Sequence, residues 1–510
     1  MCYNGGRKYP AFLRECVFSE HTYDIVHAKE IHYGTKTERK LIMKTNRYTA
    51  EGVSLRALNT YFEKAKAERQ EIHTLQIWKG ERCLCRLAPA PYSCDDRREV
   101  YSLSKTFCST AVGCAVDEGL LTVDDRIVDI FADKLPEVVS ENLAKMKVRH
   151  VLSMNTGHSA CVMPHMFASD DAAKAFLAQE VPYEPGTHFA YNTGATCLLS
   201  AIITRLTGET VYDYLCRKIL HPIGIRDAVW NTCAEGINEG GIGIQVTSDD
   251  IIQLARLYQN RGMWNGKRLL SEEWIKEASS FHSDNSMNGT PDWKCGYGYQ
   301  IWLNVEDGYR GDGALGQLMV ILPKRDIIIA VQAKVPSIQI ELDLLMELAA
   351  HILDEDDETE LRLLDFAPAV PDEIACPVDD AWYTLSENLM GWKKLHLTRE
   401  KDVLTLDFSN GRKVSRITAG AGHYEYSAHS DPWRTPKLLT LMDARYPETL
   451  RMASYYTVSG DTCTITARHL SNPNTERITL KWDGDTLDIT LGVPDRVAEK
   501  AKSIHCTRIS

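Results

Sequence analysis

The stretch Tyr101-Ser102-Leu103-Ser104-Lys105-Thr106-Phe107 decides how this chain of 510 residues is interpreted. Ser102 and Lys105 are three positions apart, where an apolar helical pattern begins. Both side chains therefore emerge on one helix face, and the ammonium can reach the hydroxyl. Apolar residues continue at helical spacing through Ala111, and Gly119 suits a C-cap. The sequence predicts a buried helix that carries an S-x-x-K arrangement.

The Ser102–Lys105 pair has the chemistry of an activated nucleophile. A serine hydroxyl is a poor nucleophile until a neighbouring base takes its proton. A lysine can be that base near neutral pH only if burial and nearby positive charge lower its pKa well below roughly 10.4. The positive end of the helix disfavours an ammonium and favours an oxyanion. Because S-x-x-K also occurs by chance, its context decides the interpretation.

Composition predicts a globular protein of two or three domains. Hydrophobic residues make up 44% and charged residues 25%, which supplies a sizeable core. A net charge of -12 argues against nucleic acid or an anionic membrane as the main partner, because both require a basic face. The 15 cysteines lack paired spacing, so we expect reduced thiols, with Cys83 and Cys85 as small buried residues.

Targeting and cofactor signals are not found. Residues 1–48 contain no apolar core of a secretory signal, and no apolar segment reaches 18 residues, so we expect a cytoplasmic protein without a membrane span. No His-Glu-x-x-His or paired cysteine spacing indicates zinc, and neither a metal nor a cofactor is expected.

The chain divides by its periodicity into an N-terminal extension (1–50), a mixed helix-and-strand domain (51–356) and an all-β domain (357–510). The mixed domain is expected to open with a helix at 54–71, a strand at 73–78 and a second strand that ends at residue 87. Three more strands are expected at 297–302, 317–322 and 326–332, followed by a closing helix at 340–353. The all-β domain, with a period of two and turns such as Asn410-Gly411, is predicted to be a barrel or sandwich. It can cap a cleft, mediate dimerisation or stabilise the chain.

Two further segments carry chemistry. Glu184–Gly194 places Tyr191 in a turn ahead of an apolar helix, and a buried tyrosine hydroxyl beside an ammonium can relay protons. Tyr309–Gln317 is a glycine-rich entry into a strand. Glycines there let a substrate approach the backbone, so that strand N–H groups form an oxyanion hole with the N–H of Ser102. Read alone, each segment is also an ordinary turn or hairpin.

Together the three segments resemble the serine β-lactamase-like superfamily, in the branch of class C β-lactamases, D-alanyl-D-alanine peptidases and related esterases. The resemblance covers roughly 54–354 and extends to residues 148–158, 240–250 and 262–274. It implies an α+β fold, in which an antiparallel sheet is flanked by helices. Ser102 would start a buried helix between an all-α lobe and an α/β lobe.

The resemblance also implies roles for individual residues. Ser102 would be the acylated nucleophile, Lys105 its proton acceptor and Tyr191 the second acid/base. The oxyanion would lie between the backbone N–H groups of Ser102 and Ala314. The positions expected to contact substrate are Asn192, Thr193, Gly311, Asp312 and Gly313.

Two departures bear on the substrate. Thr193 stands where the family has an asparagine that contacts an acylamino group. Gly311-Asp312-Gly313 lacks the cation that would hold a β-lactam carboxylate, and strand alternation should turn the adjacent Arg310 away. The sequence therefore favours an ester or amide substrate over penicillin.

Other functions stay open at this point. A catalytically weak member could bind a peptide or acyl ligand, and an acyltransferase would use the same serine; a small acyl or peptide molecule is the partner in each case, and a homo-oligomer is possible. Gly157–Cys161 imitates a nucleophile elbow and Gly262–Lys267 a phosphate loop, but both depart from their motifs. A Ser-His-Asp triad is not excluded by sequence.

Overall fold

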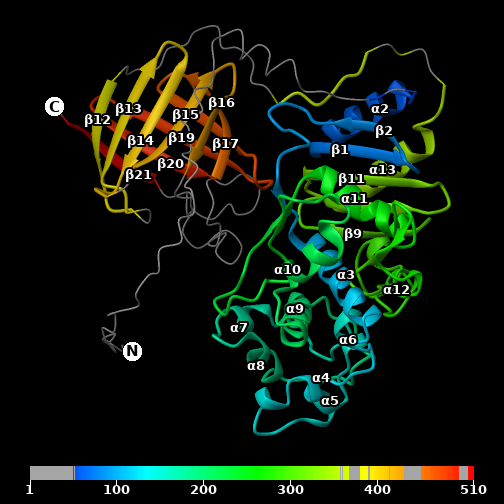
Figure 1. Cartoon of the computed structure of the whole chain (residues 1–510). Helices are drawn as coiled ribbons and strands as arrows, with labels where there is room; N and C mark the ends of the chain where they lie inside the picture. Colours follow the sequence, from blue (N-terminus) through cyan, green and yellow to red (C-terminus); the bar gives the residue numbers. More distant parts are fainter. Residues whose placement is uncertain are drawn as a thin grey trace, which may run out of the picture. The chain divides into compact units, whose positions relative to one another are not determined.

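The computed structural model describes residues 50, 52–355, 358, 360–366, 380–388, 391–412, 414–429, 450–492 and 503–509. The predicted N-terminal extension lies almost wholly outside these residues, and the domain boundaries stay predictions. Figure 1 shows a mixed part, with helices packed on a sheet, and an all-β part. The predicted α+β class is confirmed.

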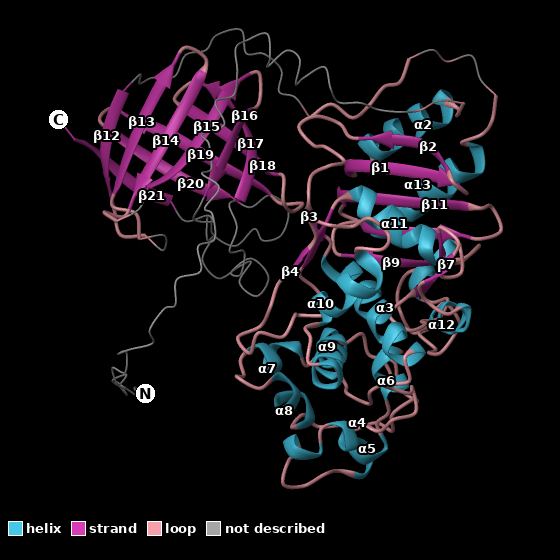
Figure 2. Ribbon diagram, in the orientation of Figure 1, coloured by secondary structure: helices cyan, strands magenta, loops and turns pink. Residues whose placement is uncertain are grey.

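The mixed part is built on one antiparallel sheet, whose strands appear in magenta in Figure 2. Its strand order is β2-β1-β11-β10-β9-β8. The bounds are Glu71–Lys79 (β1), Arg82–Leu87 (β2), Trp302–Leu303 (β8), Tyr309–Gly313 (β9), Gln317–Leu322 (β10) and Ile327–Lys334 (β11). The strand predicted at 297–302 is reduced to β8, because Gln300 has a φ of 63° and interrupts the extended backbone.

Helices cover both faces of this sheet. The helices α2 (Leu55–Ala67) and α13 (Ile338–His351) pack on one face, and α3 (Ser104–Asp117) and α11 (Ser248–Gln259) belong to the core on the other. The Ser54 side chain accepts a hydrogen bond from the Ala57 N–H and caps α2. This helix ends four residues before the predicted position.

The all-α lobe consists mainly of short helices around α9 (Thr193–Thr207). The others are Ile127–Ile130 (α4), Glu141–Lys145 (α5), Val148–Leu152 (α6), Met163–Phe167 (α7), Ala172–Leu177 (α8), Val211–Leu215 (α10) and Glu272–Ala278 (α12). Two small strand groups complete this part: β3 (Arg98–Glu99), β4 (Val229–Trp230) and β5 (Ile244–Val246), and the hairpin β6 (Met263–Trp264) with β7 (Lys267–Arg268). The hairpin occupies the segment that imitates a phosphate loop.

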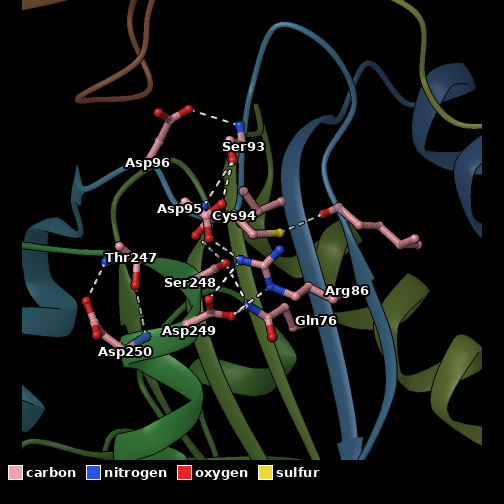
Figure 3. Close-up of polar contacts among 12 residues, drawn as sticks. Gln76, Arg86, Ser93, Cys94, Asp95, Asp96, Thr247, Ser248, Asp249 and Asp250 are labelled. Atoms are coloured by element: carbon pink, nitrogen blue, oxygen red, sulfur yellow. Dashed lines mark hydrogen bonds and ion pairs between the residues drawn. The ribbon is translucent and has the colours of Figure 1, made fainter. Parts of the chain in front are cut away.

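The start of α11 is fastened to the sheet by a polar network, shown in Figure 3. The Arg86 guanidinium, from β2, donates to both oxygens of Asp249 at 3.0 and 2.8 Å. Gln76, from β1, donates to the Ser248 hydroxyl at 2.8 Å. Because α11 directly follows β5, this network also fixes the segment that enters the candidate site.

The all-β part is a closed antiparallel barrel, which settles the choice between barrel and sandwich. Nine strands, in the order β15-β14-β13-β12-β21-β20-β19-β18-β17, close through a parallel β15–β17 pairing, and β16 pairs with β17. The bounds are Asp380–Leu385 (β12), Lys394–Glu400 (β13), Val403–Ser409 (β14), Val414–Ala421 (β15), Glu425–His429 (β16), Leu450–Ser459 (β17), Thr462–His469 (β18), Thr475–Asp483 (β19), Thr486–Gly492 (β20) and Ser503–Ile509 (β21).

Side chains alternate along the barrel strands as the period of two predicts. In β14, Leu404, Leu406 and Phe408 are buried in the barrel core, and the residues between them are partly exposed.

Two findings concern the described residues as a whole. None of their helices is both long and apolar enough to cross a membrane. Their cysteines are free thiols, and Cys85 is buried whereas Cys83 is only partly buried.

Candidate active site

Ser102 lies on a tight turn just before a buried helix. The turn, Tyr101–Leu103, is a 3-10 turn, and α3 begins only at Ser104, two residues later than predicted. Tyr101 has a φ of 45°, a strained backbone conformation for a residue with a side chain. The Ser104 hydroxyl donates to the Tyr101 carbonyl oxygen at 2.5 Å and accepts from the Ile244 N–H at 3.2 Å. The surrounding structure therefore holds the nucleophile turn in place.

Lys105 is buried beneath Ser102, one helical turn along. Its Nζ lies 3.0 Å from Ser102 Oγ, 3.2 Å from Thr193 Oγ1 and 2.8 Å from the Gly241 carbonyl oxygen. The side chain is 1% exposed, so no solvent replaces these partners. Gly241 lies just before β5, which pairs with β3, the strand that leads into the nucleophile turn.

Burial lowers the pKa of Lys105 to about 8. A neutral amine has two N–H donors and one lone pair. The Gly241 carbonyl can only accept a hydrogen bond, and the Thr193 hydroxyl can accept the second N–H. The lone pair then faces the Ser102 hydroxyl, which can donate its proton. The same three oxygen atoms can accept the three N–H bonds of the ammonium form, so the site can hold Lys105 in both protonation states.

The Tyr191 ring lies beside Lys105. Its ring stacks on Trp302, with centroids 5.3 Å apart and planes at 23°, and the Lys105 Nζ lies 4.9 Å from its centroid. Burial raises the pKa of Tyr191, the Asp312 carboxylate raises it further, and a hydrogen bond with the Ser102 side chain opposes them. The phenol therefore keeps its proton near neutral pH and is suited to donate it.

The glycines of the third segment let β9 approach the nucleophile turn. A Cβ on Gly311 would lie 2.4 Å from Leu103 Cδ1, and one on Gly313 would lie 2.1 Å from the Val100 carbonyl oxygen. A side chain at either position would force β9 and the nucleophile turn apart. Their predicted role in substrate approach stays a prediction. Ala314 directly follows β9, and its part in an oxyanion hole stays a prediction.

Arg310 and Asp312 form a buried ion pair on one face of β9. Arg310 is fully buried and Asp312 is 8% exposed. The guanidinium donates to four oxygen atoms, those of Asp312 Oδ2 (3.1 Å), the Leu303 carbonyl (3.2 Å), Asn304 Oδ1 (3.0 Å) and the Asp292 carbonyl (3.1 Å). These bonds hold the cation in the protein interior.

Two neighbouring residues of the second segment have different surroundings: Asn192 caps a helix, and Thr193 contacts Lys105. Asn192 is fully buried, and its side-chain oxygen accepts hydrogen bonds from the N–H groups of Val162 and Gly194, both at 3.0 Å. It is the N-cap of α9. Thr193, the residue that departs from the family pattern, bonds Lys105 instead. Contact of either residue with substrate stays a prediction.

Comparison with known proteins shows the family to which the chain belongs. The Beta-lactamase family model matches residues 79–339, half of the chain. The chain belongs to the β-lactamase family. It is 24% identical to a 6-aminohexanoate-dimer hydrolase of Paenarthrobacter ureafaciens, over 50% of this chain and 70% of that protein. It is also 28% identical to a D-aminopeptidase of Brucella anthropi, over 27% of each chain.

Among solved structures, this member of the β-lactamase family is similar to EstCE1, a hydrolase with promiscuous acyltransferase activity. The TM-score is 0.50 and the identity 15%, over 58% of this chain and 98% of that one. The likeness shows a shared fold. Named relatives of this β-lactamase family member are hydrolases, and the predicted family is confirmed.

Sequence reasoning missed two features of the site. Trp302 was expected only as a strand residue, although its position near a run of aromatic residues was a signal. Cys161, which is exposed, was considered only as part of a false motif, although its side chain interacts electrostatically with Lys105 and Tyr191.

Proposed function

We propose that this chain is a serine hydrolase that forms a covalent acyl-enzyme on Ser102. The observation that carries the proposal is the position of the Lys105 amine, 3.0 Å from Ser102 Oγ, with a pKa lowered to about 8 by burial. A lysine at this pKa is partly neutral at physiological pH and can take the serine proton.

The proposed reaction has two halves. Ser102 Oγ attacks the carbonyl carbon of an ester or amide as its proton passes to Lys105 Nζ. The backbone N–H groups of Ser102 and Ala314 stabilise the oxyanion. Tyr191 donates its proton to the leaving oxygen or nitrogen and regains one from the Lys105 ammonium. Water then attacks the acyl-enzyme, and its hydrolysis restores the Ser102 hydroxyl.

The charges of the site support an acyl substrate without a carboxylate beside the third segment. The Arg310 guanidinium is held by four oxygen atoms, and Gly311 stands where a cation would be needed for a β-lactam. We therefore expect esters or amides to be turned over faster than penicillin. The names of the hydrolase relatives support the same reaction class.

The test is intact-mass analysis of wild type, Ser102→Ala and Lys105→Ala after exposure to a fluorophosphonate, a short-chain p-nitrophenyl ester and a penicillin. The proposal expects adducts from the first two reagents that disappear in Ser102→Ala. The folded wild-type protein without a Ser102-dependent adduct and without ester turnover would contradict it. That result would favour a protein that binds an acyl ligand without turning it over.

The acyl acceptor is tested in the same assay. Adding an alcohol and analysing the products shows whether water alone or also the alcohol takes the acyl group.

A further inference from the structure

Gln300 is a buried residue that connects three helices around the candidate site. It is 2% exposed, and its φ of 63° is a strained backbone conformation for a residue with a side chain. Such strain persists only where the surrounding structure fixes it. The fixing contacts are hydrogen bonds to α3, α6 and α9.

Gln300 is attached most firmly to the end of α6. Its backbone N–H donates to the Leu152 carbonyl oxygen at 3.0 Å. Its Nε2 donates to the same oxygen at 2.8 Å and to the Val151 carbonyl oxygen at 3.3 Å. These carbonyls belong to the last turn of a helix, where they have no partner within the helix. Backbone and side chain of Gln300 are therefore held together at one place.

The acceptor groups of Gln300 bond to the two helices that carry the site. Its backbone carbonyl oxygen accepts from the Thr106 hydroxyl of α3 at 3.3 Å, and its Oε1 accepts from the Thr196 hydroxyl of α9 at 2.6 Å. Thr106 directly follows Lys105. Thr196 lies one helical turn after Thr193, on the same side of α9. Gln300 thus joins the helix of the lysine to the helix of its hydroxyl partner.

The other acceptor of Lys105, the Gly241 carbonyl, lies against the same side of α9. A Cβ on Gly241 would lie 2.7 Å from Thr193 Cγ2 and 3.2 Å from Thr196 Cβ. The Gly241 backbone is therefore packed directly on α9. A shift of this helix would displace the Thr193 hydroxyl and disturb the Gly241 carbonyl together.

We propose that Gln300 holds α9 against α3 through the Thr196 hydroxyl, and so keeps the hydrogen-bond partners of Lys105 in place. The inference rests on the proposed function, in which Lys105 is the base. Gln300 acts through Thr196 and Thr106, so it is a positioning residue.

The pH–rate profile reports this role, because burial controls the ionisation of the Lys105 amine. Burial lowers its pKa to about 8. A shift of α9 would admit water, which solvates the ammonium and replaces a lost acceptor, so the pKa would rise. The other titratable groups that act on Lys105, or lie over it, stay unchanged in the variants below: Cys197, Cys161, Asp312, Cys108 and Tyr191.

Two residues supply the variants. Thr196→Val removes the hydroxyl and keeps the shape, and Thr196→Ser keeps the hydroxyl. Gln300→Met keeps the length of the side chain without its hydrogen bonds. For each variant, and for the double variant Thr196→Val/Gln300→Met, kcat/KM for p-nitrophenyl butyrate is measured between pH 6 and 10. Circular dichroism and thermal denaturation show which variants are folded, and if Gln300→Met does not fold, the Thr196 variants still test the contact.

In Thr196→Val the midpoint of the profile should move from about 8 to about 9. The value of kcat/KM should then fall about tenfold at pH 7, but by less than about threefold at pH 10, where the amine is mostly neutral in both proteins. Thr196→Ser should keep the wild-type midpoint. The double variant should have the midpoint of Gln300→Met, because both changes break one contact.

Thr74→Val is the matched control. Thr74 and Thr196 are both 0% exposed, and the Thr74 hydroxyl also donates to the Oε1 of a buried glutamine, Gln332, at 3.3 Å. This pair joins β1 to β11 and does not involve α9. Thr74→Val should therefore keep the wild-type midpoint and rate.

The outcomes separate the two proposals. An unchanged kcat/KM in folded Thr196→Val, or an equal loss at every pH, would overturn the positioning role alone if wild type is labelled at Ser102 by the fluorophosphonate. Thr196→Ser with the profile of Thr196→Val would overturn it as well. Wild type that is not labelled at Ser102 would overturn the proposed function, and this inference with it.

Discussion

At the scale of single residues, the amine of Lys105 is the group whose ionisation should set the activity. Its neutral form is the base, and its pKa is lowered to about 8. The kcat/KM for an ester should therefore rise with pH through about 8 and level off above it. A pH–rate profile between 6 and 10 measures this rise.

Lys105→Arg is the informative variant for the same group. Arginine stays protonated in proteins and cannot act as the base. We expect a loss of roughly 10²- to 10⁴-fold in kcat/KM. A flat pH profile in wild type, or substantial activity in Lys105→Arg, would contradict the assignment of Lys105.

Thr193 offers a second prediction at this scale. Its hydroxyl is one of three partners of Lys105 Nζ. Thr193→Val keeps the shape and removes the acceptor, which should lower kcat/KM by up to about tenfold, the effect expected from the loss of one hydrogen bond. Thr193→Ser keeps the hydroxyl and should retain most activity. Equal activities in the two variants would show that the hydroxyl is not needed.

The sequence predicts only part of the site at this scale. Ser102 and Lys105 could be predicted because one helical turn joins them. Asn192 as a helix cap has a local signal, because its side chain accepts from the Gly194 N–H two residues on. Its second bond, from the Val162 N–H, and the stacking of Trp302 on Tyr191 could not be predicted, because they join residues that are distant in sequence.

At the scale of elements, the distance between β9 and the nucleophile turn depends on Gly313. A Cβ at this position would lie 2.1 Å from the Val100 carbonyl oxygen, so Gly313→Ala must push β9 away from the turn. This movement should displace the Ala314 N–H and lower kcat about 10²- to 10³-fold, as expected for the loss of one oxyanion donor. Steady-state ester hydrolysis measures the effect.

Gly289→Ala is its control, because a Cβ there would meet no atom within 4 Å. Normal kcat in a folded Gly313→Ala protein would rule out this role for the close approach of β9.

A second element-scale prediction concerns the contact between α2 and α13. The Tyr61 hydroxyl donates to the buried Glu341 carboxyl at 2.5 Å, and burial raises the pKa of Glu341 to about 7. Folding thus favours the protonated acid, while the unfolded chain ionises at about 4.5. The free energy of unfolding should fall as pH rises from 4.5 to 7, in total by ~3 kcal/mol, and stay lower above pH 7.

Glu341→Gln tests the sign of this effect. The variant has no charge to bury, so it should be more stable than wild type at pH 8 and similar at pH 4.5. Thermal denaturation at both pH values measures the difference. A variant that is less stable at pH 8 would show that the ionised carboxylate is tolerated.

At the scale of the whole molecule, the three largest apolar cores each draw on one part of the chain. Two of them consist of residues between 58 and 364, and the third of residues between 381 and 506. The two parts are also in contact, because Arg468 Nη1 lies 2.7 Å from Glu71 Oε2. Separate cores favour separate unfolding transitions, modified by such contacts.

Leu406→Ala should therefore affect mainly the barrel. Leu406 is fully buried in the barrel core, and its truncation should destabilise that part by ~2–5 kcal/mol. Differential scanning calorimetry should show one transition moved to lower temperature. Leu58→Ala, in the core between α2 and the sheet, should move the other transition. A single transition that both variants shift equally would contradict independent cores.

The family and the fold class could be predicted because they depend on local periodicity and on three short segments in order. The closure of the barrel could not, because the pairing of β15 with β17 joins strands that are separated by β16 and by chain outside the described residues. Such pairing depends on the whole domain rather than on any window of sequence.

The ring of barrel strands also sets an order of events during synthesis. The first strand, β12, pairs with the last, β21. The ring cannot be completed on the ribosome until Ser503–Ile509 has emerged, and contacts so distant in sequence form slowly. Until then β12 exposes an unpaired backbone edge, at which a nascent chain is most open to chaperones and to wrong partners.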